Sequence, residues 1–165
     1  MAERLNRSSL VTEQQNPSSM DLDSRSVAEI LEIINREDCK VAEAVHEVLP
    51  QLEEVVNLAV STIKSGHHVI YVGAGTSGRL GVLDAAECPP TFSAPPDFFQ
   101  GVIAGGEEAL RQSIEGAEDK PEDAERDLKS IDVREGDVVI GIASSGTTTY
   151  VLHALQYATT KGSST

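Results

Sequence analysis

The chain has 165 residues, of which 39% are hydrophobic and 24% charged, a composition typical of a globular domain with a substantial core. Its formal net charge of −14 argues against a nucleic-acid or anionic-membrane surface, where a basic patch is expected. Apolar runs are only strand-sized and the first residues lack the apolar core of a secretory signal, so neither a membrane span nor a signal peptide is predicted. Two cysteines suit a reducing compartment, and we expect a cytoplasmic protein.

The N-terminal part predicts a polar arm followed by helices. Residues 1–19 are rich in Ser, Gln and Asn, and we expect them to be extended or loosely held. Ser26 and Glu29 have the spacing of a capping box, which predicts a helix start. Apolar residues then recur at helical intervals, with a second helix expected around Val41 and a third from Pro50.

After these helices the pattern changes to strands separated by helices. Apolar, β-branched runs at residues 69–72, 98–104 and 138–143 predict buried parallel strands. The predicted fold is therefore α/β, an incomplete doubly wound parallel sheet of about three strands preceded by N-terminal helices. We expect residues 1–65 to form the arm and helices, and residues 66–165 to form the sheet domain.

The predicted helices of the sheet domain have clear end signals. The helix after the first strand is expected to stop near Glu87, because Pro89-Pro90 follows. Another helix is expected from Glu107 through Ile114, an acidic helix over residues 121–128, and a last one that ends at Gly162. The final residues lie where a fourth strand is due, so we interpret the chain as truncated.

Two predicted strands run directly into loops of glycines and hydroxyls. The first is followed by Gly73–Gly78, where Thr76 and Ser77 add hydroxyl donors to backbone N–H groups at a helix start. The third is followed by a second such loop, at residues 144–149. Because ligands of open α/β sheets bind beyond the carboxyl ends of the strands, these loops predict an anion site.

Other functions of the first loop are weaker interpretations. Gly73, Gly75 and Gly78 match the dinucleotide fingerprint, but the acidic residue expected about 20 positions on is not at the end of the next strand. Hydroxyls favour a phosphomonoester over a pyrophosphate, so nicotinamide or flavin binding is the less favoured alternative. No Gly-Lys-Ser/Thr follows, which excludes a Walker loop, and Arg79 replaces the second outer glycine of a nucleophile elbow.

Five further residues have both a structural and a functional interpretation. His67 and His68 are adjacent in a strand, point to opposite faces and have no partner at ligand spacing, so we expect solvated histidines and no metal site. We expect Cys88 to be a small packed residue and not a reactive thiol. Glu87 and Glu118 end predicted helices, and each is either a solvated glutamate or an acid–base group.

At these residues the sequence resembles the N-acetylmuramic acid 6-phosphate etherases, which belong to the sugar isomerase (SIS) superfamily of phosphosugar-binding domains. The block GAGTSGRLGVLDAAECPP is far more specific than a lone glycine pattern. The stretches that carry the resemblance are Thr12–Pro17, Gly73–Pro90, Ile103–Gly106, Glu115–Asp119 and Gly141–Gly146. Thr147 and Thr149 depart from the family, which usually has an arginine and a proline there, so a cation is missing from this loop.

The resemblance implies cleavage of a D-lactyl ether at carbon 3 of the sugar, by elimination and then hydration, with no metal or organic cofactor. An acid must protonate the ether oxygen while a base removes the proton at carbon 2. Glu87 is implied as the proton donor and Glu118 as the second catalytic carboxylate. The residues implied to bind the sugar phosphate are Gly75, Thr76, Ser77, Gly78, Ser144, Ser145, Gly146 and Thr147.

Two alternatives stay open beside the etherase. The related glucokinase regulatory protein senses phosphosugars without converting them, so a binding protein is the rival function. An inactive fragment is the other, because the family continues for about as many residues again and completes the sheet. The resemblance also implies a homodimer.

Overall fold

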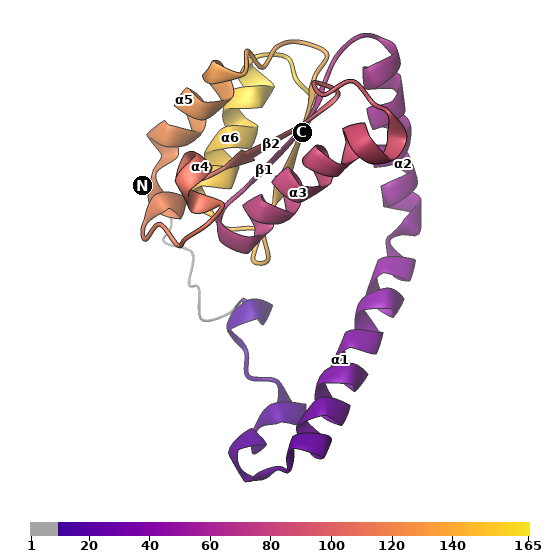
Figure 1. The fold of residues 1–165 in the computed structure, drawn as a ribbon, viewed down its shortest axis with the longest axis vertical. Coiled ribbons are helices and arrows are strands. Elements are labelled where there is room, and N and C mark those ends of the chain that lie inside the picture. Colours follow the sequence, from indigo (N-terminus) through magenta and orange to yellow (C-terminus); the bar gives the residue numbers. More distant parts are fainter. Residues whose placement is uncertain (1–9) are drawn as a thin grey trace. The chain divides into compact units, whose positions relative to one another are not determined.

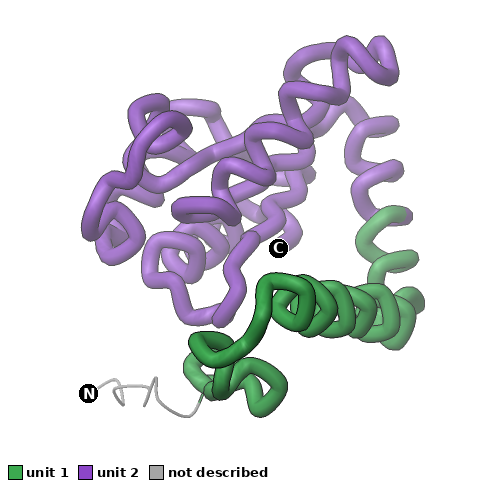
Figure 2. Tube along the Cα trace, turned by 60° about the horizontal axis from the view of Figure 1, so that its bottom comes forward, with its two compact units in different colours: residues 1–56 green, residues 57–165 purple. Residues whose placement is uncertain are grey.

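The computed structural model describes residues 10–165, and the chain divides into two compact units, residues 1–56 and 57–165 (Figure 2). The division falls inside helix α2 (Leu49–Lys64), ahead of the predicted boundary between residues 65 and 66. Each unit is described by itself below.

The N-terminal arm is folded, which corrects the expectation of an extended segment. The Asn16 side chain accepts a hydrogen bond from Ser18 N at 2.9 Å and donates to Glu37 Oε2 at 3.0 Å. Because asparagine both accepts and donates, it organises a polar segment that has no apolar core. The part of the predicted arm at residues 1–9 lies outside the described residues. The arm contains the 3-10 turns η2 (Val11–Glu13), η3 (Pro17–Ser19) and η4 (Leu22–Ser24).

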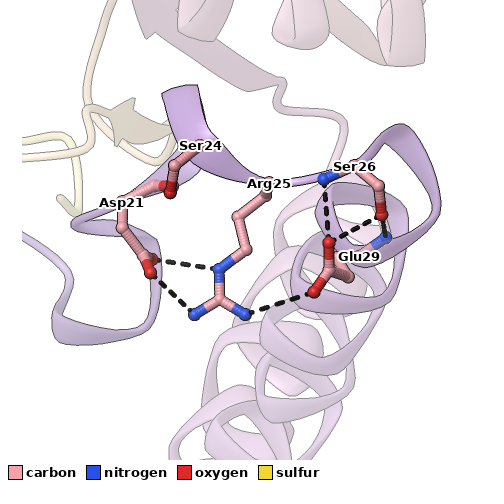
Figure 3. Close-up of polar contacts among 5 residues, drawn as sticks. All are labelled: Asp21, Ser24, Arg25, Ser26 and Glu29. Atoms are coloured by element: carbon pink, nitrogen blue, oxygen red, sulfur yellow. Dashed lines mark hydrogen bonds and ion pairs between the residues drawn. The ribbon is translucent and has the colours of Figure 1, made fainter.

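Helix α1 (Val27–Glu47) begins at the predicted capping box. Ser26 N donates to Glu29 Oε2 at 2.8 Å, and Glu29 N donates to Ser26 Oγ at 3.4 Å (Figure 3). Hydrogen bonds from the Ser26 side chain and backbone lower the pKa of Glu29. Arg25 lies between two carboxylates, 2.9 Å from Asp21 and 3.7 Å from Glu29 (Figure 3). The predicted helix start is confirmed.

The separate helix expected around Val41 is wrong, because α1 continues without a break to Glu47. No glycine or proline interrupts residues 27–47, so the backbone has no reason to leave the helix. The apolar face of α1 is exposed to solvent in the described residues of this single chain: Val27 is 74%, Leu31 61% and Ile34 51% exposed. Helix α2 then begins at Leu49, which places Pro50 in its first turn as predicted.

A parallel three-stranded sheet forms the centre of the second unit, in the order β2 (Phe99–Ile103), β1 (Val69–Gly73), β3 (Val138–Ile142). Ser164 adds a parallel bridge on the free side of β3, because Val139 N donates to Ser164 O at 2.8 Å and Ser164 N to Asp137 O at 2.9 Å. The bridge is a single residue, and the sheet of the described residues has three strands. The incomplete doubly wound α/β fold is confirmed.

Helices cover both faces of the sheet (Figure 1). Helices α5 and α6 close one face over a core that contains Ile70, Val72, Val139 and Tyr150, each at most 1% exposed. Helix α3 lies on the other face, where its residue Gly81 approaches β1. The helices are α3 (Gly75–Phe92), α4 (Gly106–Ala109), α5 (Pro121–Ser130) and α6 (Thr149–Thr160).

Two predicted helix ends are wrong. Helix α3 runs through Pro89 and Pro90 to Phe92 instead of stopping near Glu87. The fixed φ of proline suits a helix, but both residues lack a donor and their rings crowd the preceding turn. Burial of Cys88, directly before Pro89, offsets part of this cost. The second error is a helix that is shorter than predicted: α4 has only four residues, whereas the helix was expected to reach Ile114. The chain after it turns back so that Ile114 packs on Gly105, where a Cβ would lie 3.2 Å from the Ile114 side chain.

Candidate functional site

The loop after β1 is a close-packed turn that presents backbone N–H groups. A Cβ on Gly73 would lie 2.5 Å from Gly78 N, and a Cβ on Gly78 would lie 2.6 Å from Ile103 Cγ1, so neither position accepts a side chain. Helix α3 follows at once, and its N-cap Ala74 makes no side-chain cap. The N–H groups of the first turn are therefore left for an anion, beside the hydroxyls of Thr76 and Ser77.

The loop after β3 repeats this arrangement. It leads into α6, whose N-cap Thr148 also makes no side-chain cap. Ser145 Oγ lies 2.8 Å from Thr147 Oγ1 and accepts from Thr147 N at 3.3 Å, while Gly146 has a positive φ of 68°. The hydroxyls are thus held together by a tight turn at the carboxyl end of the strand.

Strand pairing brings the two loops to one edge of the sheet. Gly73 of β1 pairs with Ile142 of β3, and neighbouring strands lie about 4.8 Å apart, so the loops start side by side. The strand order β2-β1-β3 also places the reversal of winding direction between β1 and β3. This reversal is where open α/β sheets bind their ligands.

A pocket of about 190 Å³ lies on the other side of the β1 loop, next to the end of β2. Its lining includes Gly75, Arg79, Ala104, Glu115 and Glu118. The Arg79 guanidinium donates from Nη2 to the Gln112 carbonyl at 3.0 Å, which ties the start of α3 to the segment that contains both glutamates. Sequence reasoning missed Arg79 as a site residue, although a basic residue directly after a phosphate-type glycine loop was the available signal.

The structure places the two candidate catalytic carboxylates in different surroundings. Glu118 lies in the 3-10 turn η5 (Ala117–Asp119) and lines the pocket together with Gly75. Glu87 is exposed on α3, twelve residues after Gly75. At a rise of 1.5 Å per residue this is about 18 Å along the helix axis. One copy of the chain therefore brings Glu118, but not Glu87, to the glycine loop.

Cys88 of α3 and Tyr71 of β1 have raised pKa values. Cys88 is buried, and burial together with the charge of Asp84 raises the pKa of its thiol. Burial, followed by the hydrogen bond with Asp84, likewise raises the pKa of Tyr71. Cys88 is 7% exposed, which confirms the prediction of a packed residue.

The interpretation of His67 and His68 as solvated histidines that point apart is wrong. Buried Asp137, 1% exposed, accepts from His68 N at 3.0 Å and lies 3.2 Å from His68 Nδ1 and 3.8 Å from His67 Nδ1. The cause is the pairing of β1 with β3, which sets Asp137 beside the start of β1. Between residues 10 and 165, no three His, Cys, Asp or Glu side chains are grouped to hold a metal.

Residues 41–159 match the family described as the glucokinase regulatory protein N-terminal SIS domain. The chain belongs to this SIS family. The predicted membership of the phosphosugar-binding SIS superfamily is thereby confirmed. Among the helices of residues 10–165, none combines the length and apolar character needed to cross a membrane.

Relatives with high identity share one name, N-acetylmuramic acid 6-phosphate etherase. The protein of Glaesserella parasuis is 53% identical over 156 residues, which cover 94% of this chain and 51% of the relative. That of Rhodopirellula baltica is 51% identical over 165 residues, 100% of this chain and 54% of the relative. That of Vibrio vulnificus YJ016 is 49% identical over 162 residues, 98% of this chain and 54% of the relative. The chain spans about half the length of these relatives.

Proposed function

We propose that this chain forms the phosphosugar-binding part of an N-acetylmuramic acid 6-phosphate etherase. The observation that carries the proposal is the pairing of Gly73 with Ile142, which starts two glycine-hydroxyl loops side by side at the point where the sheet reverses its winding. Two uncapped helix N-termini and four hydroxyl groups, those of Thr76, Ser77, Ser145 and Thr147, suit the three oxygens of a phosphomonoester. The etherase names of relatives at 49–53% identity support the substrate.

The chemistry of an ether elimination explains why carboxylates belong beside this cradle. A base takes the proton from carbon 2 of the open-chain sugar, the carbon 3–oxygen bond breaks, and an acid gives a proton to the departing lactate oxygen. Water then adds to carbon 3 of the unsaturated aldehyde, which gives N-acetylglucosamine 6-phosphate. In this mechanism Glu87 is the acid and Glu118 the second carboxylate, in the role of the base.

The proposal includes a homodimer, because Glu87 lies far along α3 from the glycine loop of its own chain. Glu87 lies about 18 Å along the helix from the glycine loop, so the Glu87 that serves a given pocket comes from a second copy of the chain. Leu80 and Leu83, 55% and 57% exposed, precede Glu87 by seven and four residues and share its helix face. An exposed apolar face around the carboxylate supports a homodimer contact there. We also propose a cytoplasmic location, which the free thiols of Cys39 and Cys88 support.

A second function rests on the description of the matched family. The SIS family that matches residues 41–159 is described after a regulatory protein, so phosphosugar sensing without turnover is the alternative. Both functions need the phosphate cradle, and only the etherase needs the carboxylates. Release of lactate therefore separates them.

Titration of the full-length protein tests the cradle. N-acetylglucosamine 6-phosphate should bind at least tenfold more tightly than unphosphorylated N-acetylglucosamine, because the loop N–H groups and hydroxyls bind the phosphate. Ser77→Ala should weaken binding of the phosphorylated sugar several-fold, whereas the control Ser65→Ala, at an exposed serine beyond α2, should leave it unchanged. Equal affinity for the two sugars would contradict the phosphate cradle.

A further inference from the structure

Arg79 is a cation with most of its hydrogen-bonding capacity unused. It is partly buried in the second turn of α3 and lines the pocket with Gly75 and Glu118. Its guanidinium has five N–H donors, and the hydrogen bond from Nη2 to Gln112 O at 3.0 Å uses one of them. The bond to a backbone carbonyl fixes the side chain without neutralising its charge.

No carboxylate of residues 10–165 lies within 4.0 Å of the Arg79 guanidinium, although the chain has 27 acidic residues and two glutamates line the same pocket. Glu115 accepts instead from Ser113 Oγ at 3.1 Å. A half-buried, unpaired guanidinium with its planar fork of donors suits a carboxylate from a ligand.

The position of the pocket separates this cation from the phosphate cradle. The two hydroxyl loops start at the paired ends of β1 and β3, whereas Arg79 faces a pocket beside Ala104 at the end of β2. None of the residues from Ser144 to Thr147 lines this pocket. A ligand with two anionic groups would therefore meet them on opposite sides of the β1 loop.

The substrate of the proposed function has two such groups, a phosphate and the carboxylate of its lactyl ether. We propose that Arg79 binds this carboxylate and so distinguishes the substrate from the product sugar phosphate, which lacks it. The inference rests on the proposed function. In a lactyl ether the bridging oxygen is two bonds from the carboxylate carbon, so a carboxylate bound at Arg79 brings the reacting bond into the pocket that Glu118 lines.

Affinity for substrate and product, measured separately on full-length protein, tests the proposal. Arg79→Gln should raise the KM for N-acetylmuramic acid 6-phosphate about 10- to 100-fold, as expected for loss of a charge-assisted pair. Its Kd for N-acetylglucosamine 6-phosphate should change less than about threefold. Arg79→Lys should recover part of the loss, because it keeps the charge without the fork. Arg111→Gln, an exposed arginine outside the pocket lining, is the matched control and should match the parent.

Three other outcomes overturn the proposal. An equal loss of affinity for substrate and product would assign Arg79 to the phosphate or to the fold of the loop. An unchanged KM with a lower kcat would assign it to positioning of Glu118 alone. Unchanged values for both would remove it from the site. If the parent protein releases no lactate, the proposed function fails, and the affinities of the two sugars for parent and Arg79→Gln protein still decide whether Arg79 recognises the carboxylate.

Discussion

Replacement of Glu87 by glutamine in the full-length protein should slow lactate release by about 10²–10⁴-fold at saturating substrate. Glutamine keeps the shape and a hydrogen-bonding amide but has no proton to give to the departing lactate oxygen. Affinity for N-acetylglucosamine 6-phosphate should stay within about threefold of the parent, because the proposed phosphate site lies at the loops after β1 and β3 and not at Glu87. A steady-state assay of lactate, combined with calorimetric titration of the product, measures both quantities.

Glu118→Gln should slow lactate release by a similar factor. It should also block exchange of the carbon 2 proton with solvent, because Glu118 is the proposed base for that proton. The control is Glu122→Gln, an exposed glutamate in the first turn of α5 that is absent from the pocket lining. This variant should match the parent in rate and exchange.

A Glu87→Gln protein that releases lactate within a few-fold of the parent would remove Glu87 from the mechanism and favour the sensing function.

Asp137→Ala should lower the free energy of unfolding by about 3–5 kcal/mol, the range seen when one partner of a buried charged network is removed. The carboxylate is 1% exposed and accepts from His68 N at 3.0 Å and Arg134 N at 2.9 Å, so it joins the start of β1 to the turn before β3. Its loss leaves these two partly buried backbone donors without their acceptor. Urea unfolding followed by circular dichroism measures the change.

Asp97→Ala is the matched control for this prediction. Asp97 lies 3.8 Å from Nε2 of the same His68, but its side chain is 67% exposed. Exposed pairs of this kind contribute roughly 0–1 kcal/mol, so the urea midpoint should hardly move. Equal destabilisation by the two substitutions would show that burial of Asp137 is not the cause of its effect.

The sequence predicted the parts of the fold where local pattern and tertiary packing agree. The β-branched run before Gly73 is a strand because both of its faces are covered, and Ser26 with Glu29 starts α1 because a capping box is satisfied locally. Three strands were expected from the three apolar runs, and the sheet has three. In each case the residues that signal the structure are those that form it.

The errors arise where contacts between distant residues decide the conformation. Pro89 predicts a helix end from its missing N–H group, but α3 continues to Phe92, and Cys88 directly before Pro89 is buried. His67 and His68 look solvated until the pairing of β1 with β3 brings Asp137 to them. The place of Arg79 after the glycine loop marked it as a candidate, but its pocket could not be predicted, because that pocket depends on a segment more than thirty residues further along the chain.

The most direct test of the account is incubation of the full-length protein with N-acetylmuramic acid 6-phosphate in water enriched in ¹⁸O. Elimination followed by hydration predicts one lactate for each N-acetylglucosamine 6-phosphate. The hydroxyl oxygen on carbon 3 of the sugar should carry ¹⁸O, and the hydroxyl oxygen of lactate, which was the ether oxygen of the substrate, should not. Binding of the phosphosugar without release of lactate would contradict the etherase function, and ¹⁸O in the lactate would contradict the elimination mechanism.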